Sequence, residues 1–432
     1  MHITPFAYQI FWILLEPLIR LYLYVRISQK KEDKTRIKER FGHGYKSSRP
    51  HGTLIWLHAV SLGESNAAIN LVTHFKEMRS EWHFLITTNT ITAADHIEKS
   101  CAGMPVTHIF QPLDHPRWVS SFLEYWKPNG AIFLESDFWF NLVTNASKKQ
   151  LPVIFASSQI SHIAKARWQK NPSLARKLFS SPSLILAIDD KQKNNFEALA
   201  SDIKNNNSQT VKIVGSLKSR ISNNALNSAY EKALRHYAKQ SGCRFILAAS
   251  THENEEQLIA KAVAKLSNAE KYQLIFAPRH PHRAAEIINQ LGMMPQRSQG
   301  ELPLRQNPYF LSDSFGEMTS LYNVADIIII GGSFFHSGGH NPIEPALAGK
   351  PMICGKSIFN NEADYIDLIK AGIIRQIESH ETLNETLDET LTEIRQSDKA
   401  MLRAIIKGQK MAQEACMRPA KAAHYIISTI EK

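Results

Sequence analysis

Short apolar runs alternate with longer amphipathic segments along the chain beyond residue 50. The short runs predict strands at residues 53–60, 83–88, 107–111, 131–135, 153–157, 184–188, 212–214, 245–249, 273–278, 326–330 and 352–354. Helix-length segments between them include residues 64–78, 225–239, 255–266 and 283–291. Strands separated by helices are typical of βαβ units that build parallel sheets. The chain is therefore predicted to be an α/β protein.

The first part of the chain follows a different pattern. Residues 6–27 are mainly aliphatic and aromatic, over about the length that spans a bilayer. Glu16 and Arg20 stand four residues apart, so a helix would place them on one face, where they pair. Because charges at mid-span are costly, this pattern favours a tilted or interfacial helix. It leaves open whether the segment spans.

A basic cluster follows this apolar segment. Its members are Lys30, Lys31, Lys34, Arg36, Lys38 and Arg40. Such a cluster favours the cytoplasmic side of a membrane and attracts anionic lipid. The alternative is a buried apolar helix followed by a solvated basic one. The combination of apolar and polybasic signals favours membrane association.

Composition adds a preference for anionic partners. The chain has 432 residues, enough for about two to three domains. Its 51 Lys and Arg exceed its 40 Asp and Glu and give a net charge of +11, which attracts nucleic acid, acidic lipid or phosphorylated substrates. The 4 cysteines are scattered and form no CxxC pair, which argues against a zinc site or a disulfide framework.

The division into domains follows from these patterns. We predict an anchor helix with its basic segment at 1–45, two Rossmann-like domains at 46–215 and 216–405, and a C-terminal helix at 406–432 that can pack back on the first domain. The chain lacks the GxxxxGK[ST], GxSxG and GxGxxG patterns. Their absence disfavours P-loop NTPases, α/β-hydrolases and dehydrogenases.

Carboxylates follow two predicted strands of the first half, where ligands bind in parallel sheets. Glu64 comes after the first strand and opens the next helix. It is a candidate general base, although spacing alone favours a helix-capping role. Glu135 and Asp137 follow the fourth strand beside aromatic residues. They either position a sugar or form a polar loop over the core.

Cations and glycines in the second half suggest phosphate binding. Lys218 and Arg279 follow strands and suit phosphate contacts, with ordinary surface cations as the alternative. Gly338 and Gly339 permit backbone N–H groups to approach an anion before a short helix, and Glu344 there can accept bonds from ribose hydroxyls.

Two histidines lie in the same glycine-rich segment. His336 and His340 stand four residues apart, but with two glycines between them they are not expected to share a helix face. We therefore reject a zinc site.

Four motifs together resemble one enzyme family. Residues 56–64 read Trp-Leu-His-Ala-Val-Ser-Leu-Gly-Glu, residues 250–253 Ser-Thr-His-Glu, and residues 278–281 Pro-Arg-His-Pro, and residues 331–345 form the glycine-rich segment. In this order and spacing they resemble the 3-deoxy-D-manno-octulosonic acid (Kdo) transferases of lipopolysaccharide assembly. The resemblance runs from the apolar N-terminus to beyond Asn360.

The resemblance implies a GT-B glycosyltransferase with two Rossmann-like domains facing a cleft. It implies that the domain at 46–215 binds the acceptor, lipid IVA, and that the domain at 216–405 binds the donor, CMP-Kdo. The enzyme is then expected at the cytoplasmic face of the inner membrane, in contact with its anionic lipids. Nucleic acid is not an expected partner, and neither a cofactor nor a metal is expected.

The resemblance also assigns roles to residues. Glu64 matches the catalytic base, and Glu135 and Lys218 match positions that stabilise the transition state. The positions that match the CMP site are Pro278, Arg279, Gly316, Glu317, Met318, Asn341, Pro342, Ile343 and Glu344. Further phosphate or sugar contacts are expected from Ser250, His280, Gly338, Gly339 and His340. Transfer is expected to invert the anomeric centre by direct displacement.

The resemblance is incomplete near the acceptor. Residues 135–137 read Glu-Ser-Asp where the family usually has Glu-Thr-Glu, and residues 157–162 lack the expected arginines. Two other readings stay open: a GT-B enzyme that uses a UDP- or ADP-sugar, and a membrane-tethered protein that binds nucleic acid or acidic lipid without catalysis.

Overall fold

The computed structural model describes residues 3–200, 209–218 and 227–432. The chain divides into two compact units. The first comprises Met1–Arg220 and Met417–Lys432, and the second comprises Ile221–Cys416. The sequence-based division placed the corresponding boundaries at 215 and 405.

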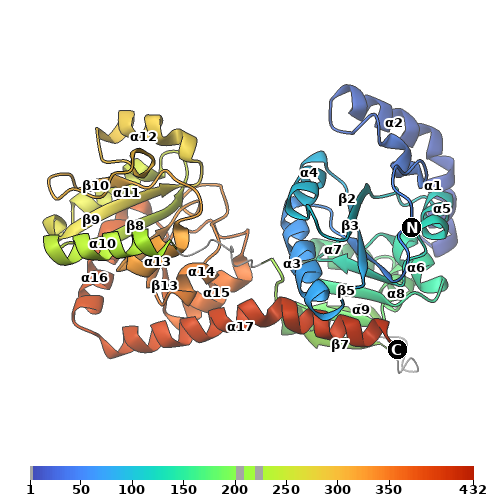
Figure 1. Ribbon diagram of the computed structural model, residues 1–432. Coiled ribbons are helices and arrows are strands. Elements are labelled where there is room, and N and C mark those ends of the chain that lie inside the picture. The colour runs from blue at the N-terminus through green and yellow to red at the C-terminus, as the bar shows by residue number, and fades with distance from the viewer. Residues whose placement is uncertain (1–2, 201–208, 219–226) are drawn as a thin grey trace. The chain divides into compact units, whose positions relative to one another are not determined.

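The first unit contains a seven-stranded parallel sheet (Figure 1). Its strands are β1 (Leu54–His58), β2 (His83–Thr88), β3 (Val106–Phe110), β4 (Gly130–Leu134), β5 (Val153–Ser158), β6 (Leu184–Ala187) and β7 (Thr210–Ile213). They lie in the order β3-β2-β1-β4-β5-β6-β7. The chain therefore reverses its direction of travel across the sheet between β1 and β4. Such a switch point is where open α/β sheets bind ligands.

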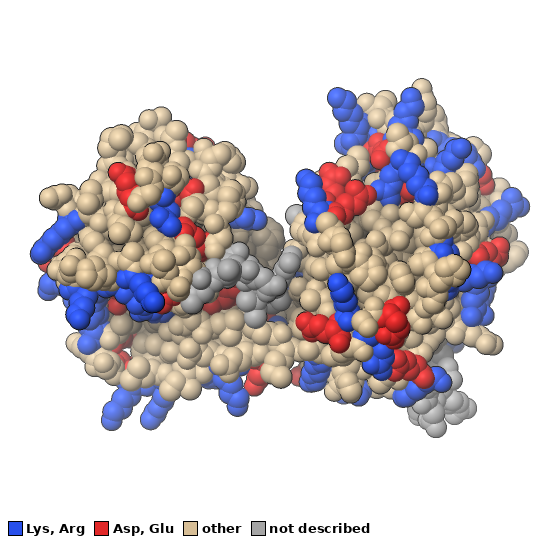
Figure 2. Space-filling model, viewed as in Figure 1, with Lys and Arg blue, Asp and Glu red and all other residues tan. Residues whose placement is uncertain are grey.

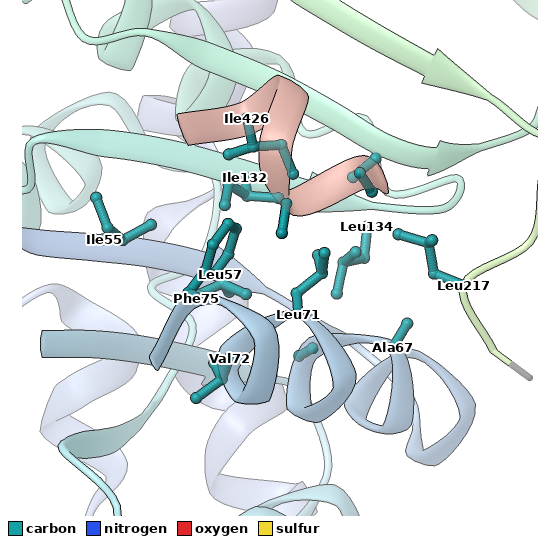
Figure 3. Close-up of a cluster of buried hydrophobic side chains, with 14 of the residues drawn as sticks. Ile55, Leu57, Ala67, Leu71, Val72, Phe75, Ile132, Leu134, Leu217 and Ile426 are labelled. Atoms are coloured by element: carbon teal, nitrogen blue, oxygen red, sulfur yellow. The ribbon is translucent and has the colours of Figure 1, made fainter. Parts of the chain in front are cut away.

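Helices cover both faces of this sheet. They are α3 (Leu62–Met78), α4 (Ile91–Ser100), α5 (Pro116–Trp126), α6 (Phe140–Lys148), α7 (His162–Gln169), α8 (Pro172–Phe179) and α9 (Asp190–Ala200). One core lies under α3 and α4, where the end of α17 (Lys399–Ile430) adds Ile426 (Figure 3). The other core lies under α5, α6, α8 and α9. The C-terminal residues thus complete the first unit, although the whole second unit precedes them in the sequence.

The second unit repeats the architecture with six parallel strands. They are β8 (Arg244–Thr251), β9 (Tyr272–Pro278), β10 (Tyr309–Leu311), β11 (Ile327–Ile330), β12 (Met352–Cys354) and β13 (Ile374–Gln376), in the order β10-β9-β8-β11-β12-β13. The helices are α10 (Ser228–Ser241), α11 (Glu255–Ala264), α12 (Ala284–Leu291), α13 (Met318–Val324), α14 (Ile343–Leu347), α15 (Glu362–Ala371), α16 (Leu383–Arg395) and the first part of α17. Its switch point lies between β8 and β11.

The α/β prediction is confirmed, and the eleven predicted strands are all present within a few residues. The sequence missed β10 and β13. Both are three residues long and lie at the edges of the second sheet. An edge strand has a neighbour on one side only and does not need the long apolar run by which the central strands were recognised. The first two residues of the predicted helix 225–239 lie outside the described residues.

The N-terminal segment forms two helices, α1 (Pro5–Leu14) and α2 (Glu16–Ser28), where one was expected. Pro17 lies in the first turn of α2, a position that tolerates its missing N–H group, and the break falls just before it. The predicted pair of Arg20 and Glu16 is confirmed, with Nη2 and Oε1 2.8 Å apart. Among the described helices, none is both long and apolar enough to cross a membrane.

The basic segment after α2 only partly matches the expected cationic surface. Arg40 is buried and pairs with Glu32 at 2.9 Å, and Arg36 pairs with Glu39 at 2.9 Å. Arg40 also donates to Asn89 O at 2.7 Å and Arg36 to His108 O at 2.8 Å, so these two arginines tie the segment to the first unit and contribute little to the expected cationic surface. The exposed cations of the cluster are Lys30, Lys31, Lys34 and Lys38.

Candidate functional site

Glu64 lies at the carboxyl end of β1, in the first turn of α3. Its N–H group approaches the N-cap Ser61 Oγ at 3.4 Å, and its Oε2 accepts the Val60 N–H at 2.5 Å. The residue is 8% exposed. The helix-capping reading is therefore correct as a description of its bonds. It does not exclude catalysis, because capping occupies one carboxylate oxygen.

The surroundings of Glu64 disfavour its charged form. Burial, and then the nearby Asp137 and Glu135 carboxylates, raise the pKa of Glu64 to about 8, against the opposing hydrogen bonds from Val60 and Ser61. A carboxylate with a pKa close to working pH is a much better proton acceptor than an ordinary glutamate. The arrangement therefore suits a general base.

Glu135 and Lys218 form an ion pair beside this carboxylate. Lys218 Nζ lies 2.7 Å from Glu135 Oε2, with the two side chains 30% and 5% exposed. Glu135 comes directly after β4 with a φ of 57°, a conformation that costs free energy for a residue other than glycine. Its Oε1 is buried and has no hydrogen-bond partner among the described residues. Such strain and an unused acceptor are typical of functional sites.

The loop that carries Lys218 is fixed from β5. Ser157, at a φ of 55°, accepts the Leu217 N–H on its Oγ at 3.1 Å. A Cβ built on Gly63 would lie 3.5 Å from Lys218 Cε, so the lysine stem runs past the start of α3. Glu64, Glu135 and Lys218, the three residues that the resemblance groups as catalytic, thus converge at the β1/β4 switch point of the first unit.

Sequence reasoning did not assign a role to His58. His58 Nδ1 lies 2.8 Å from Thr87 Oγ1, and its Nε2 lies 3.5 Å from Asp137 Oδ2. Within the described chain, that Nε2 and that Oδ2 are both buried without a hydrogen-bond partner. The sequence feature that could have pointed to His58 is its neighbour Asp137, which stands where the family's Glu-Thr-Glu motif has its second glutamate.

In the second unit, cationic and imidazole groups gather after β8, β9 and β11. Arg279 follows β9 and donates its backbone N–H to Thr251 O at 3.0 Å. Its side chain is exposed, and no ion pair of Arg279 occurs in the described part of the chain. His280 beside it is also exposed. Ser250, at the end of β8, has a φ of 55°, the same strain seen at the first site.

The predicted turn at 316–318 is already rich in internal contacts. Gly316 has a φ of 84°. The Glu317 carboxylate pairs with Arg297 at 2.8 Å, accepts Asn227 Nδ2 at 2.8 Å, and accepts the Ser314 hydroxyl. Met318 begins α13 and packs on the core. The carboxylate of Glu317 therefore orders this turn.

The glycine-rich segment is shaped by its own packing. Gly338 donates its N–H to Ser357 Oγ at 3.1 Å, and Gly339 donates to Gly332 O at 2.8 Å. A Cβ on Gly338 would lie 2.6 Å from Asn360 Nδ2. These two N–H groups therefore have protein partners, and positive φ with close packing explains both glycines. Asn341 Oδ1 accepts the Ile343 N–H at 2.9 Å, which places Pro342 and Glu344 at the start of α14.

The chain is similar to known proteins of one enzyme family. Residues 35–221 match the family model of the 3-deoxy-D-manno-octulosonic-acid transferase (kdotransferase). A probable mitochondrial 3-deoxy-D-manno-octulosonic acid transferase of Arabidopsis thaliana is 34% identical over 82% of this chain and 81% of its own length. A 3-deoxy-D-manno-octulosonic acid transferase of Haemophilus influenzae is 30% identical over 82% of this chain and 83% of its own length.

The chain belongs to the Kdo transferase family. It is therefore a glycosyltransferase, and the resemblance read from the motifs is confirmed. A glycosyltransferase of Rickettsia africae has the same fold, with a TM-score of 0.56 at 14% identity, over 89% of this chain and 100% of that one. The fold of this Kdo transferase is of the GT-B type.

The structure groups the predicted site residues of this Kdo transferase into two sets. Glu64, Glu135 and Lys218 meet in the first unit. The second set lies at the carboxyl end of the second sheet: Ser250, Pro278, Arg279, His280, Gly316, Glu317, Met318, Gly338, Gly339, His340, Asn341, Pro342, Ile343 and Glu344. Among the described residues, no three His, Cys, Asp or Glu side chains gather to hold a metal ion.

The raised pKa of Glu64 predicts a pH-dependent stability. The native state holds the Glu64 proton up to about pH 8, whereas an unfolded glutamate releases it above its ordinary value of 4.5. The free energy of unfolding should therefore fall as pH rises through this range. In Glu64→Gln that dependence should weaken, with a gain on the order of a few kcal/mol at alkaline pH. Urea denaturation of both proteins from pH 5 to pH 9 measures it; parallel curves would contradict the assignment.

Proposed function

We propose that this Kdo transferase moves Kdo from CMP-Kdo to lipid IVA, with Glu64 as the general base. The observation that carries the proposal is the convergence of Glu64 with the Glu135–Lys218 pair at the β1/β4 switch point. Family membership supports the transferred sugar. The donor nucleotide, the acceptor, the inversion and the role of Glu64 are the parts that we propose.

The chemistry follows from the position of the carboxylate. Glu64 takes the proton of an acceptor hydroxyl, and the hydroxyl oxygen attacks the anomeric carbon of Kdo. The sugar–phosphate bond breaks, its electron pair stays on the phosphate oxygen, and CMP leaves. Attack opposite the leaving group inverts the anomeric centre. Lys218, held by Glu135, is a fixed positive charge beside the base. It stabilises the negative charge that develops on the attacking oxygen as its proton is removed.

The donor is proposed to bind in the second unit around Arg279. Its exposed guanidinium suits bidentate contact with the phosphate of CMP. Ser250 and His280 lie at the carboxyl ends of β8 and β9, and His340 lies in the segment after β11. The charge that builds on the departing phosphate would be met there.

The rival donors are UDP- and ADP-sugars. We expect nucleotide release with lipid IVA as acceptor from CMP-Kdo alone, measured for CMP-Kdo, UDP-sugars and ADP-sugars in parallel. Arg279→Ala should lower kcat/KM for CMP-Kdo by a factor on the order of 10². Release of UDP or ADP in place of CMP would overturn the donor assignment.

We further propose that α1 and α2 dock on the anionic lipids of the cytoplasmic face of the inner membrane, where lipid IVA is presented. Large apolar side chains are exposed on both helices: Phe6, Phe11, Leu14, Leu18, Leu21 and Tyr24. Exposed lysines follow them, and Lys and Arg side chains gather around α2 in Figure 2. An apolar face next to cations is the combination that binds an anionic interface.

Removing apolar surface from α1 and α2 should therefore weaken membrane binding. Leu14→Asp, at a side chain that is 73% exposed, should reduce binding to vesicles of anionic lipid by a factor of about ten or more. Met293→Asp is the matched control, because Met293 is 79% exposed in the second unit. Co-sedimentation with the vesicles measures both. Equal binding of Leu14→Asp and the parent protein would count against docking through these helices.

A further inference from the structure

Two histidines join the two sides of the switch point in the second unit. His252 follows β8, and His340 lies in the segment after β11. Their Nε2 atoms are 2.9 Å apart, their ring centroids 5.1 Å, and their planes differ by 10°. The distance between the ring centroids exceeds the distance between the Nε2 atoms by about two ring radii. The imidazoles therefore meet edge to edge in nearly one plane. This is the geometry of an N–H···N hydrogen bond, with one ring as donor and the other as acceptor.

The pair rests on a built support. Glu255 is fully buried, and its carboxylate accepts the N–H groups of His252 at 2.9 Å, Gly332 at 2.8 Å and Phe334 at 3.2 Å. These three bonds tie the loop after β8 to the loop after β11. A Cβ on Gly332 would lie 3.2 Å from His340 Nε2 and 3.4 Å from His252 Cδ2, so the rings lie directly over this glycine. The Glu255 carboxylate therefore fixes the backbone that carries both imidazole rings.

The groups around the pair set its charge. The basic groups near it are Arg279, Arg283 and His280, and the acidic groups are Glu255 and Glu256 at the start of α11. Glu256 is itself paired with Arg283 at 2.8 Å. Burial, then His252, Arg279 and His280, lower the pKa of His340 to about 3, and burial with the same cations lowers the pKa of His252. Both shifts favour the neutral form of the pair.

We propose that the His252–His340 pair takes up one proton when a nucleotide phosphate dianion occupies the donor subsite, and releases it when the nucleotide leaves. The proposal rests on the proposed donor site around Arg279. A dianion there adds negative charge next to the imidazoles and offsets the effect of the neighbouring cations, which together with burial favour their neutral forms. The N–H···N bond needs one acceptor nitrogen, so the pair accommodates a single additional proton.

The proton uptake has a place in the reaction. When the sugar–phosphate bond breaks, its electron pair stays on the phosphate and a singly charged diester becomes a doubly charged monoester. A proton from water, bound by the pair, neutralises part of that charge and stabilises the departing CMP. The proton returns to water when CMP leaves. Glu64 takes the separate proton of the acceptor hydroxyl and releases it to water before the next turnover, so both protons are accounted for.

Calorimetry of CMP binding tests the proposal. The full-length protein is titrated with CMP at about pH 7.5, where the phosphate is already a dianion, in buffers of different ionisation enthalpy. The slope of observed enthalpy against buffer enthalpy counts protons, and we expect uptake of about one. By linkage, CMP affinity should fall as pH rises. His252→Gln, whose amide nitrogen takes about the place of the imidazole Nε2 and can still donate to His340 Nε2, and His340→Gln should both bind CMP with little uptake, whereas His282→Gln should behave like the parent.

Each other outcome has a definite meaning. CMP binding without proton uptake would overturn the inference and leave the donor site standing. Uptake that persists in both His252→Gln and His340→Gln would also overturn it. If the folded protein did not bind CMP at all, the proposed donor site would fail and this inference with it.

Discussion

Glu64→Gln is expected to lower kcat by a factor on the order of 10²–10⁴ while the KM for CMP-Kdo changes little. The glutamine carboxamide can still accept the Val60 N–H, so the cap of α3 persists. It cannot take a proton from the acceptor hydroxyl. Steady-state kinetics with lipid IVA and CMP-Kdo measure the loss.

The pH profile separates a missing base from a disturbed helix. Only the carboxylate accepts a proton, so kcat/KM of the parent enzyme should rise with pH towards a plateau above about 8, the pKa to which burial and the Asp137 and Glu135 carboxylates raise Glu64. The residual rate of Glu64→Gln should lack this rise. Glu77→Gln, at an exposed position of the same helix, is the matched control and should keep the parent rate. Parent-like kcat in Glu64→Gln would remove this residue from the mechanism.

Lys218→Met is expected to impair both stability and catalysis. The change leaves the Glu135 carboxylate, 5% exposed, without its cation at 2.7 Å. An unpaired buried charge is costly, and since the lysine itself is 30% exposed we expect a loss of about 1–3 kcal/mol in the free energy of unfolding. The fixed positive charge next to Glu64 is also lost, so kcat should fall by a factor on the order of 10².

A double variant distinguishes the two effects of Lys218→Met. Adding Glu135→Gln removes the unpaired charge, so urea denaturation should show most of the lost stability restored. Activity should stay low, because no cation is regained. Recovery of both quantities together would mean that the pair acts only in folding, and unchanged stability in Lys218→Met would contradict the buried pair itself.

The strand pattern was readable because parallel strands buried on both faces require continuous apolar runs, as in residues 327–330. Edge strands such as β10 lack that requirement. The individual candidates Glu64, Glu135 and Lys218 were also found from their positions after strands. That they belong to one site came from the resemblance to the Kdo transferases and not from these positions, because their convergence depends on the β1/β4 switch and on Ser157. The positive φ of Ser157 and its bond to Leu217 leave no mark in the sequence.

In the second unit, the sequence pointed to contacts other than those that the structure shows. The spacing of His336 and His340 drew attention to a possible pairing within one segment, whereas the partner of His340 is His252, 88 residues earlier. Only the β8/β11 switch brings those two loops together. Likewise, the glycines at 338 and 339 suggested anion contact, and their N–H groups have partners in the protein.

The most direct test of the central claim is the mass of the lipid product. Purified protein is incubated with lipid IVA and freshly generated CMP-Kdo, beside Glu64→Gln, and the lipid is analysed by mass spectrometry. We predict a gain of one or more Kdo masses with the parent enzyme and none, or a trace, with the variant. An unchanged lipid mass with well-folded parent protein would contradict the proposed donor and acceptor, and equal gains in both samples would contradict Glu64 as the base.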